Sequence, residues 1–564
     1  MRPTFSTETR FASLREMEAH GVDLLVIGGG ITGAGIAWDA ALRGLRVGLV
    51  EQHDWAYGTS SRSTKLIHGG LRYLAQGEIA LVREIGRERT IVHNLAPHLV
   101  HPMKLLLPIY KRGPYGKWST SLGLWLYDRL AGVKRTERRR MLSRKSTLRR
   151  EPGLRLDGLL GSGLYVEYRT DDSRLTLEVL KSAHLAGAYL AHYAQVTDLL
   201  YDDHGQVCGA RALDRLSGRE HRLRAQVVIN ATGPWVDTVR RKDGDLRGKR
   251  LHVTKGVHLT VSRDRLPIEH ALYLGAEDGR MIFLIPREAV TYIGTTDTDY
   301  EGDLQKPLCT ATDTAYLLRA VNRQFPGAHL TPDDVQSAWA GVRPLVHEPG
   351  KGPSELSRKE EIMRSRSGLY SIAGGKLTGF RKMAEKIVNL AVADLQARTP
   401  SGTTSAVGRS RPRACATAYT PLSGGDVGGL GFEPFQHSMM RTGYEQYGLG
   451  HEVLHRLLRL YGSNIRTIFA YLNRDPSLNK RIAGPLPILL AEVRYAVEQE
   501  MTVSLADYLI RRTGDGLFAR KEAEQTAPAL LEAFADMLGW EERERAKQWQ
   551  GWQDALREYN PYDT

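Results

Sequence analysis

The sequence is poor in cysteine, and its three cysteines do not suggest a metal site. Cys208, Cys309 and Cys415 lie far apart, with no C-x-x-C spacing. This distribution disfavours a disulfide framework, a zinc site and an iron–sulfur cluster. Few and scattered thiols are typical of a reducing compartment, so we expect a cytoplasmic location.

Long hydrophobic runs are also missing. No stretch reaches the ~18 consecutive apolar residues that a membrane-spanning helix needs, and residues 1–21 lack the apolar segment of a signal peptide. We therefore expect neither a spanning helix nor a secretion signal.

Length and charge favour a multidomain protein with an anionic partner. A chain of 564 residues exceeds what one core fills comfortably. Its net charge of +14 attracts lipid headgroups, nucleic acid or a phosphorylated metabolite. The densest basic run, residues 133–151, contains no aromatic residue, so we expect no nucleic-acid partner. That run is either a solvated helix or loop, or a contact with an anionic membrane surface.

The clearest chemical motif lies in residues 23–51, DLLVIGGGITGAGIAWDAALRGLRVGLVE. It is typical of a strand, a glycine-rich turn, a helix and a second strand that ends in an acid. Gly28, Gly30 and Gly33 fit G-x-G-x-x-G, in which glycines allow a tight turn, close approach to a pyrophosphate and close helix packing. Glu51 is placed to accept hydrogen bonds from a ribose. The motif predicts dinucleotide binding without choosing between nicotinamide and flavin.

Later segments predict an α/β architecture in several pieces. Residues 225–233 form a second apolar strand that ends in glycine, and residues 369–395 read as a strand, a Gly-Gly turn and a long helix. Between them, residues 248–264, 280–288 and 289–300 alternate like antiparallel strands. After a Ser-, Thr-, Gly- and Pro-rich linker, apolar residues recur at helical spacing. The predicted helices are EVLHRLLRLYG, LPILLAEVRYAVEQE, SLADYLIRRTG and APALLEAFADMLGW.

Six motifs show a family resemblance. GGGITGAG, SSRSTKLIHGGLRYL, NATGPWVD, GTTDTDY, GVRPL and GGKLTGFRK resemble, in order and spacing, those of the FAD-dependent glycerol-3-phosphate dehydrogenases, D-amino-acid-oxidase-like flavoproteins. The resemblance runs from about residue 22 to 395, and TPLSGGD with the following helices extends it. It implies non-covalent FAD and oxidation of sn-glycerol 3-phosphate to dihydroxyacetone phosphate by hydride transfer to flavin N5. It also implies electron transfer to quinone by an enzyme held peripherally on the cytoplasmic membrane.

The expected fold is a discontinuous Rossmann-like FAD-binding domain with an inserted antiparallel β-rich substrate (cap) domain and a C-terminal all-helical domain. The expected domains are residues 22–95, 165–245 and 340–396 for FAD, 96–164 and 246–339 for the cap, 397–415 for the linker and 416–564 for the helical domain.

The resemblance also implies the cofactor-binding residues. They are expected in the glycine turn, at the ribose, along the pyrophosphate and flavin, and in the loop of residues 231–233. The chemistry of a reduced flavin adds the Gly-Gly turn at residues 374–378, because the helix that it opens would stabilise negative charge there. These residues are Gly28, Gly30, Gly33, Glu51, Thr59, Ser60, Ser61, Lys65, His68, Ala231, Gly233, Gly375, Lys376, Leu377 and Thr378.

A phosphate dianion beside a flavin needs fixed cations, preferably arginines. The candidates for substrate binding are Arg72 with Tyr73, Arg343, Lys376 and Arg358. Arg343 and Arg72 are alternatively structural ion pairs, and Arg358 also fits an exposed charge cluster.

Three residues are candidates for catalysis: His258, Arg343 and Lys376. A general base near neutral pH is most simply a histidine, although a histidine in a strand is usually structural. His68 is a weaker base candidate, since packing beside the flavin is its simpler role. Asp171 and Asp172 are expected to be helix N-caps.

Two other functions remain open. An oxidase that passes electrons to oxygen would share every motif, and the basic charge is compatible with a FAD-containing RNA-binding or RNA-modifying protein. The oligomeric state is also open, with a homodimer as one option.

Overall fold

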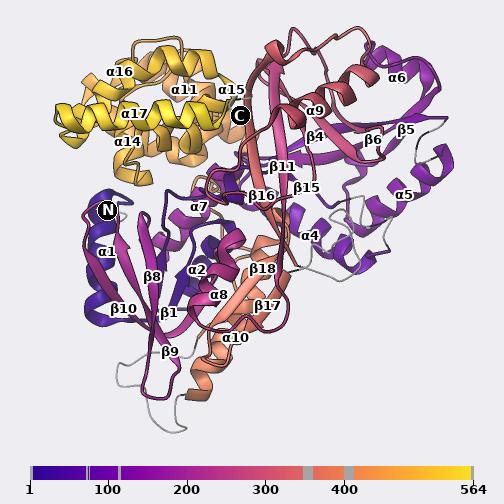
Figure 1. Cartoon of the computed structure of the whole chain (residues 1–564). Coiled ribbons are helices and arrows are strands. Elements are labelled where there is room, and N and C mark those ends of the chain that lie inside the picture. The colour runs from indigo at the N-terminus through magenta and orange to yellow at the C-terminus, as the bar shows by residue number, and fades with distance from the viewer. Residues whose placement is uncertain are drawn as a thin grey trace.

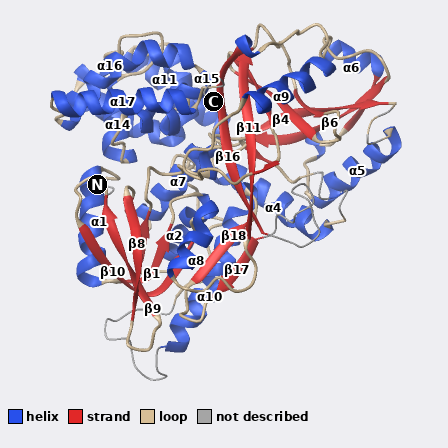
Figure 2. Ribbon diagram, in the orientation of Figure 1, coloured by secondary structure: helices blue, strands red, loops and turns tan. Residues whose placement is uncertain are grey.

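The computed structural model describes residues 4–70, 74, 77–111, 113, 116–346, 360–398 and 412–560. Two β-sheets and a cluster of C-terminal helices make up this part of the chain (Figure 1). Figure 2 shows the sheets side by side, with the C-terminal helices packed at one end of both.

The first sheet contains the dinucleotide motif. Its strand order is β17-β18-β10-β1-β2-β7. In addition, β9 pairs with β10, and β8 pairs with β9. β1 pairs in parallel with β2 and β10, and β18 is parallel to β10. The bounds are β1 Val22–Ile27, β2 Val47–Val50, β7 Tyr189–Ala191, β8 Ala194–Tyr201, β9 Val207–Asp214, β10 Glu220–Asn230, β17 Glu360–Arg364 and β18 Tyr370–Gly374.

Helices cover both faces of this sheet, which is why β1 is apolar along its whole length. Leu24 and Val26 pack toward α2 (Ile31–Leu42), α7 (Asp172–Leu185) and α10 (Phe380–Arg398). Leu25 and Ile27 face the opposite core, which includes α1 (Thr7–His20). The short α8 (Val236–Lys242) follows β10. The carboxyl ends of the parallel strands therefore meet at one edge, where a cofactor binds in this class of fold.

The second sheet forms the predicted cap. Its order is β15-β11-β14-β13-β12-β4-β6-β3, with β16 on β11 and β5 on β6, and its pairs are antiparallel except β4 with β12. The strands are β3 Leu66–Ile67, β4 His101–Tyr110, β5 Arg140–Ser143, β6 Leu159–Arg169, β11 Leu251–Ser262, β12 Ala271–Gly275, β13 Met281–Arg287, β14 Val290–Gly294, β15 Thr298–Asp299 and β16 Val335–Val346. The connecting helices are α4 Ile79–Leu95, α5 Lys117–Leu130, α6 Arg144–Arg150 and α9 Ala311–Gln324.

The C-terminal unit is helical, as predicted. Its helices are α11 Phe432–Tyr447, α12 His451–Tyr461, α13 Ile465–Arg474, α14 Leu490–Glu500, α15 Asp515–Phe518, α16 Arg520–Leu538 and α17 Glu542–Glu558. Residues 507–512 form a π-helical turn, η8 (Asp507–Arg512). α11, α13, α15 and α17 were not among the predicted helices.

The structure differs from the sequence-based prediction in two places. The basic run at residues 133–151 contains a strand, β5, which pairs with β6, as well as the short helix α6. The proposed domain boundaries at 164/165 and 339/340 fall inside β6 and β16, and both strands continue in the cap sheet beyond those points. Both boundaries thus fall within continuous strands, and the domain limits stay a prediction.

Among the described residues, no helix is long and apolar enough to cross a membrane.

Candidate active site

A cavity of about 950 Å³ lies between the two sheets. Its walls come from the carboxyl ends of β1 and β2, the segment after β2, the loop after β10, strands β11 and β16, and the turn after β18. The predicted site residues that line it are Gly28, Gly30, Glu51, Thr59, Ser60, His68, Ala231, Gly233, His258, Arg343, Gly375, Lys376, Leu377 and Thr378. Arg72, Tyr73 and Arg358 lie outside the described residues, and Gly33, Ser61 and Lys65 lie behind the cavity wall.

The glycine turn leaves no room for side chains. Gly28 has φ +115°, and a Cβ there would lie 2.6 Å from the carbonyl oxygen of Ala231. A Cβ on Gly33 would lie 1.9 Å from the Gly28 carbonyl oxygen, so Gly33 packs α2 against the turn. The N-terminus of α2 thus opens directly onto the cavity, where its partial positive charge suits a pyrophosphate.

Glu51 follows β2 and points back toward the glycine turn. Its Oε2 accepts a hydrogen bond from the Gly29 N–H at 2.7 Å, and its Oε1 accepts one from the His53 N–H at 2.9 Å. Burial raises the pKa of Glu51, although both hydrogen bonds oppose that shift. The carboxylate lies in the cavity wall beside the turn, which is where an adenosine ribose would be bound. These residues fit a dinucleotide cofactor.

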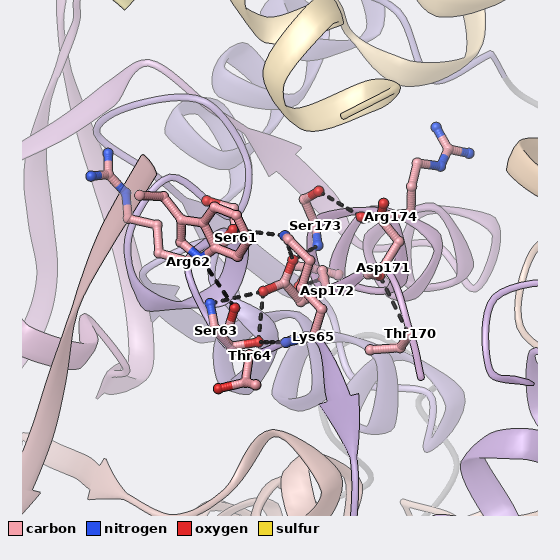
Figure 3. Close-up of polar contacts among 12 residues, drawn as sticks. Ser61, Arg62, Ser63, Thr64, Lys65, Thr170, Asp171, Asp172, Ser173 and Arg174 are labelled. Carbon is pink, nitrogen blue, oxygen red and sulfur yellow. Dashed lines mark hydrogen bonds and ion pairs between the residues drawn. The ribbon is translucent and has the colours of Figure 1, made fainter. Parts of the chain in front are cut away.

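The segment after β2 is hydrogen-bonded and ion-paired to Asp172, the first residue of α7 (Figure 3). Asp172 accepts hydrogen bonds from the Ser63 N–H and hydroxyl at Oδ2, at 3.0 and 2.7 Å, and pairs with Lys65 Nζ at Oδ1, at 2.5 Å. Lys65 also donates to the Ser61 carbonyl. Ser61 and Lys65 therefore fix the position of this segment, and the Lys65 ammonium points away from the cavity toward α7.

Asp171 caps α7 as predicted, because its side chain accepts from the Arg174 N–H. The prediction is incomplete for Asp172, which begins the helix and anchors the segment instead. This role was missed because the partners Ser63 and Lys65 are more than a hundred positions away.

His258 on β11 is buried, with 1% of its surface exposed. Its Nε2 lies 2.9 Å from Thr64 Oγ1, and its ring stacks on Trp339 with a centroid distance of 4.9 Å and an angle of 9°. No described residue is hydrogen-bonded to Nδ1. Burial lowers the pKa of His258 well below its ordinary value, and the charges of Arg343 and Lys65 lower it further. The imidazole is neutral at pH 7, which is the form that accepts a proton.

Arg343 on β16 is fixed by three oxygens. Its Nη1 donates to Asp297 Oδ1 at 2.9 Å and to the Thr296 carbonyl at 3.2 Å, while Nη2 donates to Thr295 Oγ1 at 2.9 Å. A Cβ on Gly256, across the β11–β16 ladder, would lie 2.2 Å from Nη2. Glycine at this position therefore makes room for the guanidinium beside the cavity.

Asp297 and Arg280 also line the cavity, and the sequence analysis named neither as a site residue. Arg280 donates to the Asp297 carbonyl at 3.0 Å and to Asp278 Oδ2 at 2.6 Å. Asp297 lies in the quoted motif GTTDTDY, which could have indicated it. Arg280 follows an exposed turn, and nothing in the local pattern separates it from an ordinary surface arginine.

The turn after β18 joins the segment that carries His68. The His68 N–H donates to Thr378 Oγ1 at 3.1 Å, and the same hydroxyl donates to the His68 carbonyl at 3.2 Å. Lys376 precedes the 3-10 turn η5 (Leu377–Gly379), which leads into α10 as expected. The turn therefore presents a helix N-terminus and a lysine to the same cavity.

Comparison with known proteins agrees with this geometry. Residues 23–382 match the family model of FAD dependent oxidoreductases, and residues 415–545 match the C-terminal domain of alpha-glycerophosphate oxidase. Aerobic glycerol-3-phosphate dehydrogenase of Staphylococcus haemolyticus is 47% identical, covering 95% of this chain and 94% of the relative. The same-named protein of Bacillus subtilis is 45% identical, covering 97% of each chain.

A solved structure extends the comparison to the fold. The glycerol-3-phosphate dehydrogenase of Bacillus halodurans, complexed with FAD, superposes with a TM-score of 0.82 at 42% identity, over 99% of each chain. The expectations of a flavin cofactor and of a cap and helical domain beside the cofactor domain are confirmed. This chain therefore belongs to the FAD-dependent oxidoreductases and, within them, to the family of the aerobic glycerol-3-phosphate dehydrogenases.

Proposed function

We propose that the protein oxidises sn-glycerol 3-phosphate to dihydroxyacetone phosphate and passes the electrons to quinone. The observation that carries this proposal is the meeting of a neutral buried histidine, His258, and a fixed arginine, Arg343, in the cavity that holds the glycine turn. When bound, FAD supplies the hydride acceptor for the carbon that loses two electrons.

Arg343 is proposed to bind the substrate phosphate. Its contacts with Asp297 and Thr295 hold the guanidinium in one orientation, so little conformational entropy is lost when a dianion binds. Lys376, which lines the same cavity, is proposed to add a second charge. Arg72, Tyr73 and Arg358 remain predictions for the same anion.

His258 is proposed to accept the proton of the C2 hydroxyl. Its Nδ1 has no hydrogen-bond partner among the described residues, while Nε2 lies beside Thr64. In the tautomer with the proton on Nε2, that N–H donates to Thr64 Oγ1 and the Nδ1 lone pair is available. Stacking on Trp339 keeps the ring from rotating away.

A stopped-flow experiment under anaerobic conditions tests the reaction. The yellow protein should bleach on addition of sn-glycerol 3-phosphate and regain its colour with a short-chain quinone analogue. Absence of bleaching would overturn the proposal. Recovery at a catalytic rate with air alone would make the protein an oxidase.

Helix α5 supports the proposal of a quinone acceptor on a membrane. Trp118, Leu122 and Trp125 lie on one face and are 87%, 64% and 46% exposed. Other residues of α5 line the cavity, and the basic run at 133–151 follows the helix directly. An exposed aromatic and apolar face beside basic residues is typical of a helix that lies in an anionic membrane interface.

Vesicle flotation tests this location. The wild-type protein should float with vesicles that contain phosphatidylglycerol and stay unbound with pure phosphatidylcholine. The double variant Trp118→Ala/Trp125→Ala should lose binding yet still bleach with substrate. The matched control is Tyr419→Ala/Tyr444→Ala, which removes two aromatic residues of the C-terminal region that are 88% and 71% exposed. Equal flotation of both variants would exclude α5 as the membrane contact.

A further inference from the structure

The C-terminal helices contact the loop that follows β2, although that loop is far away in sequence. This loop, residues 52–65, carries Thr59 and Ser60 to the cavity wall, and Gln52, Tyr57 and Arg62 line the cavity as well. The Ala56 N–H donates to the Gly29 carbonyl at 3.1 Å, which ties the loop directly to the glycine turn. Its position is therefore part of the cofactor site.

The first contact from the C-terminal unit is made to Asp54. Arg511 Nε donates to Asp54 Oδ2 at 2.6 Å, and Arg512 binds both carboxylate oxygens, at 2.7 and 2.8 Å. Asp54 is fully buried, and both arginines come from the turn η8. Burial raises the pKa of Asp54, but the arginines outweigh it and the pKa is lowered. The carboxylate is thus charged, and both arginines that bind it come from the C-terminal unit.

The second contact is made to Arg62. Arg62 Nη2 donates to Glu558 Oε1, near the end of α17, at 2.5 Å. The same guanidinium donates to the Tyr57 carbonyl at 3.2 Å and to the Ala340 carbonyl of β16 at 3.4 Å. One buried arginine therefore joins the loop, the cap sheet and the C-terminal unit.

The end of α17 is itself held in place at this junction. The Ala338 N–H of β16 donates to the Tyr559 carbonyl at 3.0 Å, and the Arg62 guanidinium lies over the Tyr559 ring at 5.6 Å. In Figure 1 the C-terminal end of the chain lies beside β16. Glu558 is 13% exposed, so its charge is largely removed from water and depends on Arg62.

We propose that the C-terminal helical domain completes the FAD site, with Glu558 as a positioning residue that acts through Arg62 on the loop of residues 52–65. Binding of FAD and docking of the α17 end are then thermodynamically coupled. Docking of the α17 end raises the affinity for FAD by some factor, and FAD raises the equilibrium constant for docking by the same factor. The two factors are equal because coupling between two binding equilibria is reciprocal. The proposal depends on the flavin cofactor and not on the substrate or the electron acceptor.

A titration of apoprotein with FAD tests the first half of the coupling. In Glu558→Gln, the dissociation constant for FAD, measured by quenching of flavin fluorescence, should rise about tenfold or more, and Glu558→Asp should restore part of the affinity. The matched control is Asp554→Asn, one turn earlier on α17, where the carboxylate is 53% exposed and pairs with Arg557. The control should change the constant less than twofold. Unchanged FAD affinity in Glu558→Gln would overturn the proposal, even if that variant melts at a lower temperature.

Hydrogen exchange in the wild-type protein tests the second half and does not depend on any variant folding. FAD should slow amide exchange at residues 552–560 as well as at residues 52–65, and should leave the exposed helix α11 unchanged. Equal exchange at residues 552–560 with and without FAD would overturn the proposal. Neither experiment contains substrate or quinone, so its failure is distinct from a failure of the proposed reaction.

Discussion

At the scale of single residues, the proposed reaction assigns roles to two side chains whose surroundings hold them in one orientation or one charge state. Arg343 is always charged and is held in one orientation by Asp297 and Thr295. His258 is kept neutral by burial and by nearby cations. The proposed phosphate ligand and the proposed base thus line one cavity, and each can be altered separately.

Replacing Arg343 by lysine should weaken substrate binding and leave FAD in place. Lysine keeps the charge but loses the planar fork that binds two oxygens at once. We expect KM for glycerol 3-phosphate to rise about tenfold or more, a loss of roughly 1.4 kcal/mol, with an unchanged flavin spectrum. Steady-state kinetics measure this, and Arg265→Lys, at an exposed ion pair on the cap, is the control. An unchanged KM would remove Arg343 from the phosphate site.

The pH profile should report the lowered pKa of His258. A general base works only when it is unprotonated, so kcat/KM falls as pH drops through its pKa. Because that pKa lies well below the ordinary value of about 6.5, we expect full activity at pH 6.5 and a loss only in more acidic buffer. His258→Gln should lower kcat by roughly 10²- to 10⁴-fold and abolish this acid limb. A half-maximal rate at or above pH 7 would contradict the assignment.

At the scale of elements, the sequence predicted what local pattern determines. The β1–turn–α2–β2 unit, the turn before α10 and the strand that carries His258 all follow from glycine placement and apolar periodicity over a few residues. The strand β5, with the sequence RMLS, was missed because it is only four residues long and lies within a basic run, and it forms through pairing with β6. The helix α17 was missed because its surface is mostly polar, with Trp552 and Leu556 buried.

The local sequence pattern selected many residues that line one cavity, but it did not give their side-chain partners. Fourteen predicted positions line one cavity, but the contacts of Asp172 with Lys65 and of Thr64 with His258 join residues 107 and 194 positions apart. A single sequence contains no signal for contacts at such separations. The exact partners of charged residues therefore had to come from the structure.

The turn between β1 and α2 should not tolerate a single methyl group at Gly33. The new Cβ would lie 1.9 Å from the Gly28 carbonyl oxygen, so strand and helix must separate. For Gly33→Ala we expect a loss of stability of about 1–3 kcal/mol and poor FAD retention, measured by thermal melting and by flavin content. Gly551→Ala in α17, where nothing lies within 4 Å, should instead be neutral or stabilising by up to about 1 kcal/mol. Equal melting temperatures of the two variants would contradict the packing argument.

At the scale of the whole molecule, the charge of +14 should assist capture of a dianionic substrate. Salt screens such attraction over about 8–10 Å at physiological ionic strength. We therefore expect kcat/KM for glycerol 3-phosphate to fall several-fold between 20 and 300 mM NaCl, because the Debye length shortens from roughly 20 to 6 Å over this range. We expect kcat to stay constant. An effect on kcat alone would show that salt acts on a later step.

The pairing of Arg62 with Glu558 also has a consequence for biosynthesis. The two residues are 496 positions apart, so at roughly 5–20 residues per second a ribosome makes the second about 25–100 s after the first. During that interval the loop of residues 52–65 exists without the helices that hold it, and the buried charges of Asp54 and Arg62 have no counter-charge from the C-terminal unit. On the proposed coupling, we expect tight binding of FAD to follow release of the chain, and the end of α17 to be docked less firmly in a cell short of the cofactor.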